Sequence, residues 1–90
     1  MDSSLETRRK RLRYRCWHRG TKELDLLLGR FADAHVAALS PAQLDRLEAL
    51  LEVPEPALYD WIVGRAAPAA AFDHDVMTLI RDFNNPNLPH

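Results

Sequence analysis

The sequence predicts an all-α protein, a compact five-helix bundle. Apolar residues recur at the three- and four-residue spacing of amphipathic helices, and no segment shows the two-residue alternation of a half-buried strand. Glycine and proline residues divide this pattern into five segments of helical length. With 90 residues, 47% of them hydrophobic and 28% charged, we expect one small domain over residues 1–90, with an ordered core over about residues 5–84.

The first predicted helix begins at a cap on Ser3 or Ser4 and runs to about His18. Gly20, the first glycine of the chain, ends or bends it. A second helix begins near Thr21, and Gly29 inside it predicts close packing against a neighbour. Its expected apolar face consists of Leu24, Leu27, Leu28 and Phe31, extended by Ala34, His35 and Ala38.

The third helix has the clearest start. Ser40 is the expected N-cap, Pro41 the first helical residue, and Gln43 the partner that completes a capping box. Its buried side is predicted to contain Leu44, Leu47, Leu50 and Leu51.

Pro56 suits the first position of a fourth helix, which we expect Gly64 to cap at its C-terminus. Leu58, Trp61 and Ile62 share one stripe of this helix, so Trp61 is predicted to be a core anchor. The fifth helix ends at residues 84–86, and its expected apolar face is Phe72, Val76, Leu79, Ile80 and Phe83.

The charge distribution is uneven. Residues 1–25 carry a net charge of +4 and residues 26–90 a net charge of −5, which sum to the overall value of −1. A single cysteine, Cys16, excludes an internal disulfide and fits a reducing compartment. No apolar run approaches the ~20 residues of a membrane span, and the N-terminus lacks the apolar core of a secretory signal. We therefore expect a cytoplasmic protein without a membrane contact.

The sequence gives little support for a metal site or a catalytic site. The pairs Cys16-x-His18 and Asp73-His74-Asp75 have no matching second pair at zinc spacing. On one helix Cys16 and His18 point to different faces, which argues against a nucleophile and base. No glycine-rich phosphate loop or serine motif is present. The expectation is a protein with no metal site and no catalytic residues, which is not an enzyme.

The basic segment of residues 8–15, with Tyr14 and Trp17, could bind nucleic acid through its cations and aromatic rings. The acidity of the remaining chain and the lack of a recognition-helix pattern argue against this interpretation. A solvated helix face, or an arm for an acidic protein partner, explains the same residues.

The most informative stretch, residues 19–25, joins the basic segment to the leucine-rich pattern. It places Arg19, Gly20, Glu23 and Asp25 at one helix junction. One interpretation is structural: Gly20 makes the bend, Thr21 is the N-cap of the next helix, and Glu23 lies near the helix N-terminus, where an acid is favoured. The other is a surface that presents both signs of charge to a partner.

Residues 19–25 resemble the RGxxE motif of the succinate dehydrogenase flavinylation factors, the family of SdhE and succinate dehydrogenase assembly factor 2. The similarity continues through the Leu-Leu-Glu of residues 50–52 and the Pro-to-Trp segment of residues 56–61, and ends around residues 79–81. It covers most of residues 8–83. Residues 53–55, Val-Pro-Glu, depart from the acids that the family often has there.

This resemblance implies a five-helix bundle with no cofactor of its own. Family members bind the flavoprotein subunit of succinate dehydrogenase, and in bacteria also that of fumarate reductase, and promote covalent attachment of the FAD that this partner holds. The resemblance assigns partner binding to Arg19, Gly20 and Glu23, with Asp25 at the frequent acid that follows. We expect the protein to act as a monomer. A nucleic-acid-binding regulator and an antitoxin-like interaction protein remain the alternatives.

Overall fold

The predicted all-α fold is confirmed. The computed structural model describes residues 2–86, with side chains described from Ser4 onward, and this range contains five α-helices, two short 3₁₀ helices and no strand. The elements are α1 (Asp2–Trp17), α2 (Lys22–His35), η1 (Val36–Ala38), α3 (Pro41–Leu51), α4 (Ala57–Val63), η2 (Ala70–Phe72) and α5 (Asp75–Asn84).

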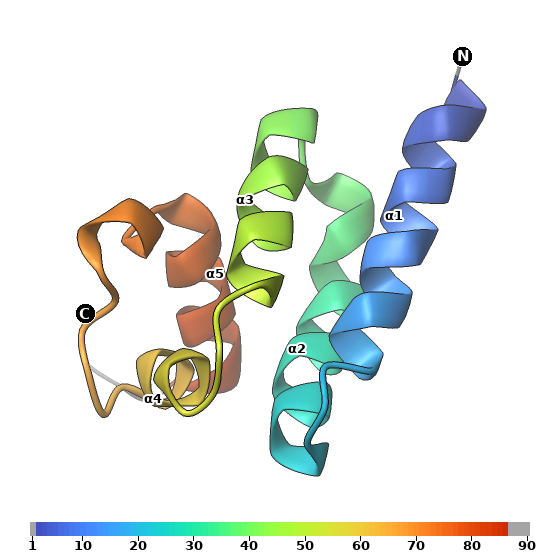
Figure 1. The fold of residues 1–90 in the computed structure, drawn as a ribbon. Coiled ribbons are helices and arrows are strands. Elements are labelled where there is room, and N and C mark those ends of the chain that lie inside the picture. The colour runs from blue at the N-terminus through green and yellow to red at the C-terminus, as the bar shows by residue number, and fades with distance from the viewer. Residues whose placement is uncertain (1, 87–90) are drawn as a thin grey trace.

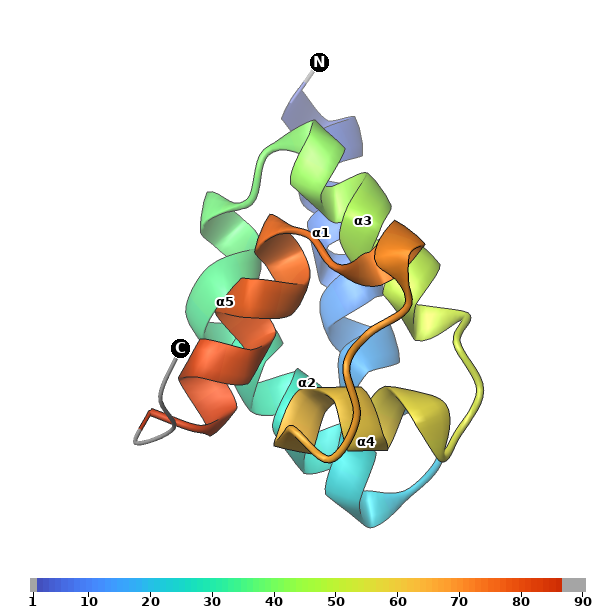
Figure 2. The ribbon, with the colours of Figure 1, turned by 90° about the vertical axis from the view of Figure 1, so that its left-hand side faces the viewer.

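The helices α1 and α2 form an antiparallel pair joined by a short turn (Figure 1), and α3 and α5 lie side by side on this pair, α3 against α1 and α5 against α2. The short helix α4 crosses the end of the bundle at which the α1–α2 turn lies (Figure 2). This arrangement brings the α3–α4 connection next to the α1–α2 turn, although the two are more than 30 residues apart in the sequence.

The core is entirely hydrophobic among the described residues, which contain no buried polar or charged side chain. Every α-helix contributes to it. The buried residues are Leu12, Cys16, Leu24, Leu28, Phe31, Ala32, Val36, Leu39, Leu44, Leu47, Leu50, Leu51, Val53, Leu58, Ile62, Val76, Met77 and Ile80. The four leucines predicted for the buried side of α3 are all among them.

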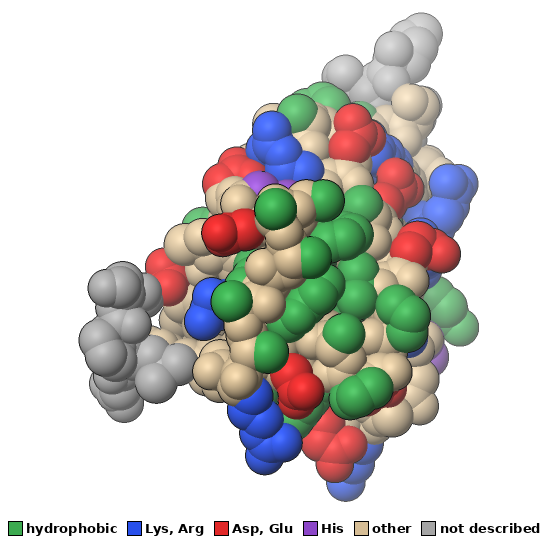
Figure 3. Space-filling view, turned by 60° about the vertical axis from the view of Figure 1, so that its left-hand side comes forward, with side chains coloured by type: hydrophobic (Ala, Val, Ile, Leu, Met, Phe, Trp, Pro, Cys, Tyr) green, Lys and Arg blue, Asp and Glu red, His purple; other side chains and the backbone are tan. Residues whose placement is uncertain are grey.

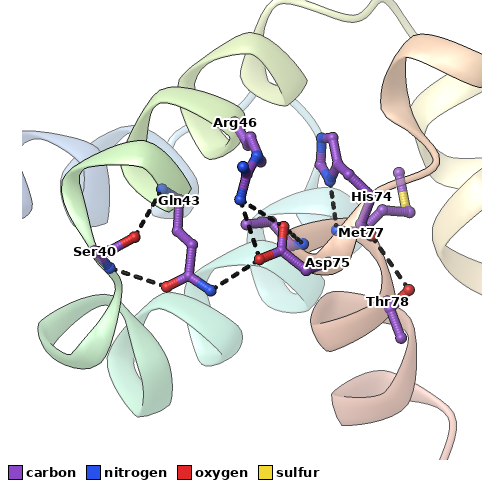
Figure 4. A network of polar contacts seen from close by, with 8 residues as sticks. Ser40, Gln43, Arg46, His74, Asp75, Met77 and Thr78 are labelled. Atoms are coloured by element: carbon purple, nitrogen blue, oxygen red, sulfur yellow. Dashed lines mark hydrogen bonds and ion pairs between the residues drawn. The ribbon is translucent and has the colours of Figure 1, made fainter.

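The helix ends follow local rules. Ser40 and Gln43 form the predicted capping box, with the Gln43 N–H donating to Ser40 Oγ at 3.2 Å and the Ser40 N–H to Gln43 Oε1 at 2.9 Å (Figure 4). Gly64 ends α4 in the left-handed conformation, with φ of 84°. Pro56 is the residue before α4 rather than its first residue. The helix α1 already begins at Asp2, so neither Ser3 nor Ser4 stands at its N-cap.

The predicted apolar face of α2 is correct only in its first half. Leu24, Leu28 and Phe31 are buried, but Ala34 and Ala38 are exposed. Ala34 lies on the outward side of α2, and Ala38 lies in the 3₁₀ helix η1 that follows His35. The buried positions after Phe31 are Ala32, Val36 and Leu39, which keep a spacing of three or four residues, so the inward face runs beside the predicted alanines and not through them.

Trp61 and Phe83 are less buried than the helical pattern predicts. Trp61 is only partly buried and packs against the outside of the core, with its ring centroid 5.5 Å from that of Phe72. Phe83 is 37% exposed, although its ring still meets the edge of Phe31. Figure 3 shows that hydrophobic side chains gather on the face around η2 and α4, with charged side chains at its margin.

Within residues 2–86, no helix combines the length and the apolar character that a membrane crossing requires.

Candidate functional site

The turn between α1 and α2 is built as a capped helix start. Thr21 is the N-cap of α2, and its hydroxyl accepts a hydrogen bond from the Leu24 N–H at 3.4 Å. Glu23 and Asp25 lie in the first turn, where negative charge is favoured by the helix dipole. The structural interpretation of this segment is therefore correct as far as Thr21 and the helix start are concerned.

Asp25 faces the turn rather than the solvent. Its Oδ1 accepts hydrogen bonds from the backbone N–H of Arg19 at 2.6 Å and from that of Gly20 at 3.1 Å. One carboxylate thus accepts hydrogen bonds from two backbone N–H groups that lie between the helices and have no helical acceptor. Asp25 holds the turn in one conformation, so its carboxylate is already occupied when a partner approaches.

Arg19 links this turn to the α3–α4 connection. Its guanidinium donates to the backbone carbonyl of Val53, and its Nε is buried without a hydrogen-bond partner among the described residues. A second link joins the Thr21 hydroxyl to Glu55 Oε2 at 3.2 Å. Residues 53–55 consequently belong to the same surface as the junction, which sequence reasoning did not predict.

Gly20 and Glu23 are the two predicted site residues that the fold leaves open. Gly20 has a φ of 145°, and a Cβ atom built there would have no heavy atom within 4 Å outside its immediate neighbours. Glu23 is exposed and has no hydrogen bond or ion pair among residues 2–86. We call Gly20 and Glu23 the junction surface. Arg19 and Asp25 lie beneath it and hold it in place.

The basic segment of α1 divides into two sets of side chains. Arg8 pairs with Asp45 and Glu48 of α3, which raises the pKa of its guanidinium through their hydrogen bonds, and Arg15 pairs with Glu52. These arginines fasten α1 to α3, so the basic segment of residues 8–15 is not one continuous free surface.

The other set lines a shallow groove on the outer face of α1, which we call the α1 groove. Its lining residues are Lys10, Arg13, Tyr14, Trp17 and His18, and its volume is about 400 Å³. The rings of Tyr14 and His18 stack with centroids 4.0 Å apart and an angle of 20° between their planes. Trp17 lies over Gly29, and a Cβ atom at Gly29 would come within 2.2 Å of the indole ring, so the predicted close packing there is confirmed.

The remaining candidates have structural roles in the described part of the chain. Cys16 is fully buried, and this burial raises its pKa to about 12, so the thiol is neutral at pH 7 and a poor nucleophile. His74 caps α5 by accepting the Met77 N–H at 3.1 Å (Figure 4). Asp75 binds Gln43 and Arg46, and the Gln43 hydrogen bond is the largest cause of its lowered pKa. No three His, Cys, Asp or Glu residues of the described range are grouped as metal ligands.

Comparison with known proteins supports one family. A family model described as "Flavinator of succinate dehydrogenase" matches residues 10–84. The chain is 42% identical over 64 residues to the FAD assembly factor SdhE of Acetobacter pasteurianus, an alignment that covers 71% of this chain and 59% of that protein. It is 37% identical over 79 residues to the mitochondrial succinate dehydrogenase assembly factor 2 of Dictyostelium discoideum, covering 88% of this chain and 56% of that protein.

A third relative, the FAD assembly factor SdhE of Coxiella burnetii, is 37% identical over 62 residues, which are 69% of this chain and 74% of that protein. The chain thus spans less than two thirds of the length of the Acetobacter and Dictyostelium relatives. The matched region contains the whole junction surface and the α1 groove.

Proposed function

The chain belongs to the family described as flavinators of succinate dehydrogenase, and we propose that it binds the flavoprotein subunit of that enzyme and promotes covalent attachment of FAD to it. The single observation that carries the docking site is the junction surface. Gly20 offers open backbone and Glu23 offers a carboxylate that no described residue neutralises. Exposed polar groups left without internal partners are available for recognition.

The rest of the junction makes this surface rigid. Asp25 fixes the backbone of residues 19 and 20, and Arg19 ties the turn to residue 53. A turn held in one conformation loses little conformational entropy when a partner binds. Arg19 and Asp25 therefore act as positioning residues, while Gly20 and Glu23 make the contact.

The proposed role is orientation and not catalysis. FAD is bound by the partner, and a histidine of the partner forms the bond to the flavin; this chain supplies neither a cofactor nor a reacting group. Holding the reacting groups of another protein in the productive geometry accelerates a reaction by reducing its entropic barrier. We extend the proposal to the flavoprotein of fumarate reductase, and to a monomer that acts in the cytoplasm.

The test deletes the gene and measures in-gel flavin fluorescence at the size of the succinate dehydrogenase flavoprotein. The deletion should abolish most of the fluorescence, and the wild-type gene should restore it. Glu23→Ala should restore it poorly, because loss of a hydrogen bond to a charged group weakens binding by about 1.5–3 kcal/mol, roughly 10- to 150-fold. Full fluorescence in the deletion strain would contradict the proposed function.

Gly20 needs a matched control, because its φ of 145° strains any residue with a side chain. Gly20→Ala carries the strain without the bulk, whereas Gly20→Arg carries both into open space. We expect both variants to lose similar stability and only Gly20→Arg to lose flavinylation fully. Normal flavinylation by a folded Gly20→Arg protein would remove Gly20 from the docking surface.

A further inference from the structure

We propose that the α1 groove is a second docking surface of this protein, which binds an acidic segment of the flavoprotein partner that also carries an aromatic or large apolar side chain. This inference rests on the proposed function and names the chemistry of the partner beside the junction surface. Three features of the groove support it: the spacing of the lining residues, the unpaired Lys10 beside Arg13, and the immobilised aromatic rings.

The lining residues occupy one face of α1. Residues 10, 13, 14, 17 and 18 follow the three- and four-residue spacing that places side chains on one side of a helix over more than two turns. The inner side carries Leu12 and Cys16, both fully buried. The groove is therefore an open, outward-facing surface of α1, which suits contact with a protein segment and not enclosure of a small molecule.

The groove contains one cation that the bundle leaves unpaired and one that is paired only in part. Arg8, Arg9 and Arg15 of the same helix donate to groups of α3, residue 39 and the α3 C-terminus. Lys10, in contrast, is exposed and has no partner among the described residues. Arg13 is 59% exposed and uses only its Nε, which lies 2.8 Å from Asp33 Oδ1. Asp33 offsets part of the charge of Arg13 but does not itself line the groove, so Lys10 and the terminal nitrogens of Arg13 remain to face a negative ligand.

The aromatic residues are held in place before any ligand binds. Tyr14 is 64% exposed, yet its ring is stacked on His18, whose Nδ1–H donates to the Tyr14 carbonyl at 2.8 Å. Trp17 is fixed by its Nε1–H, which donates to Asp33 Oδ1 at 3.1 Å, and by its contact with Gly29. Exposed aromatic rings with fixed orientation are typical anchors of protein interfaces, because little entropy is lost when they are covered.

An acidic peptide segment fits this groove better than a nucleic acid strand. The unpaired Lys10, with the terminal nitrogens of Arg13 beside it, matches one or two carboxylates, whereas a strand needs a continuous track of cations along its phosphates. Residues 26–90 carry a net charge of −5, which repels a long polyanion. The groove also ends at His18, two residues before Gly20, so a partner held at the junction surface is positioned to lay its next segment along α1.

The experiment measures the dissociation constant of the purified protein for the purified flavoprotein subunit, at low and at moderate salt. Lys10→Glu reverses a charge inside the groove, and Arg11→Glu makes a change of the same sign and size on an exposed residue of the same helix that does not line it. We expect Lys10→Glu to weaken binding on the order of tenfold at low salt and less at moderate salt, and Arg11→Glu by no more than about twofold.

A second pair of variants tests the ring. Tyr14→Ala should weaken binding on the order of tenfold, because it removes an aromatic anchor, while Tyr14→Phe keeps the stacked ring and should stay within about twofold of wild type. Melting temperatures of all four variants check that each is folded. Equal effects of Lys10→Glu and Arg11→Glu, or wild-type affinity of Tyr14→Ala, would overturn the proposal.

The outcomes also separate this inference from the proposed function. If Glu23→Ala weakens binding and the groove variants do not, the junction surface stands and the groove is not a docking surface. If the wild-type protein fails to bind the flavoprotein, both proposals are wrong. Binding of a single-stranded oligonucleotide that Lys10→Glu abolishes, without any effect of this variant on flavoprotein binding, would assign the groove to nucleic acid instead.

Discussion

The N-terminal turns of α2 and α5 contain similar residues, but these residues serve different purposes. At α5, His74 accepts the Met77 N–H, and Asp75 binds Gln43 and Arg46 (Figure 4). At α2, Asp25 likewise accepts hydrogen bonds, here from two backbone N–H groups of the turn.

The difference lies in what remains unsatisfied. The polar groups just described at the start of α5 all bind within the molecule. At the start of α2 the internal bonds end with Asp25, Arg19 and Thr21, and they leave Gly20 and Glu23 open. The start of α5 is thus a structural junction, whereas the start of α2 also presents a surface on which a partner can dock. Variants at each helix start test this difference.

The largest expected effect is at Asp25. Replacement by alanine leaves the N–H groups of Arg19 and Gly20 without their charged acceptor, so we expect a loss of about 1.5–3 kcal/mol in the free energy of unfolding, measured with urea. Asp25→Asn keeps an acceptor oxygen and should lose clearly less. If Asp25→Ala unfolds at the wild-type urea concentration, Asp25 does not hold the turn and belongs to the contact surface instead.

The cap of α5 should contribute less. His74→Ala removes the side-chain acceptor for Met77 N–H and should reduce stability by about 1 kcal/mol, the usual contribution of an N-cap. His74→Asn supplies an oxygen acceptor at the same position and should restore most of that loss. Flavinylation should be normal in both variants, because α5 contributes nothing to the junction surface. Loss of flavinylation by a stable His74→Asn protein would contradict the purely structural role of the start of α5.

How far the sequence predicts this molecule depends on the range of the interactions involved. The Ser40 capping box and the Gly64 cap follow from residues within one helical turn, and both are confirmed. Trp61 lies on the correct stripe of α4, but how deeply it is buried depends on Phe72, which follows it after a loop. Helical spacing indicates which side of a helix faces inward, but not how completely its neighbours cover that side.

The candidate site shows the same limit. The position of the junction and the N-cap at Thr21 are predictable from residues 19–25 alone. The inward orientation of Arg19 is not, because its acceptor, Val53, lies 34 residues away. The α1 groove was visible in the sequence as a basic segment with aromatic residues. Which cations of α1 are free and which are bound to α3 depends on how the helices pack.

Glu23 provides the contrast to Asp25. It lies two residues away in the same helical turn, but it is exposed and has no partner among the described residues. Glu23→Gln should therefore change the free energy of unfolding by no more than about 0.5 kcal/mol, through the helix dipole alone. Thermal unfolding of Glu23→Gln and Asp25→Ala side by side measures the contrast. A loss at Glu23 as large as that of Asp25→Ala would mean that its carboxylate supports the fold.

The smallest expected effect is the pH dependence at Asp75. The Gln43 hydrogen bond, then the Val76 N–H and Arg46, lower the pKa of Asp75 below its ordinary value of 3.8. An acid whose pKa is lower in the folded state stabilises the fold above its unfolded pKa, and this contribution is lost as the pH falls through the folded pKa.

The loss of stability should therefore develop below about pH 4, and it should be small because the Asp75 side chain is 48% exposed and solvent screens its charge. The measurement compares melting temperatures of wild type and Asp75→Asn between about pH 6 and pH 3. The amide keeps an acceptor for Arg46 and Val76 but has no charge to lose, so the two proteins should differ at pH 6 by at most about 0.5 kcal/mol and converge towards pH 3. A difference that grows as the pH falls would have the wrong sign for a carboxylate stabilised by these partners. A difference that stays constant with pH would show that the bonds at the start of α5 contribute through their geometry and not through the charge of Asp75.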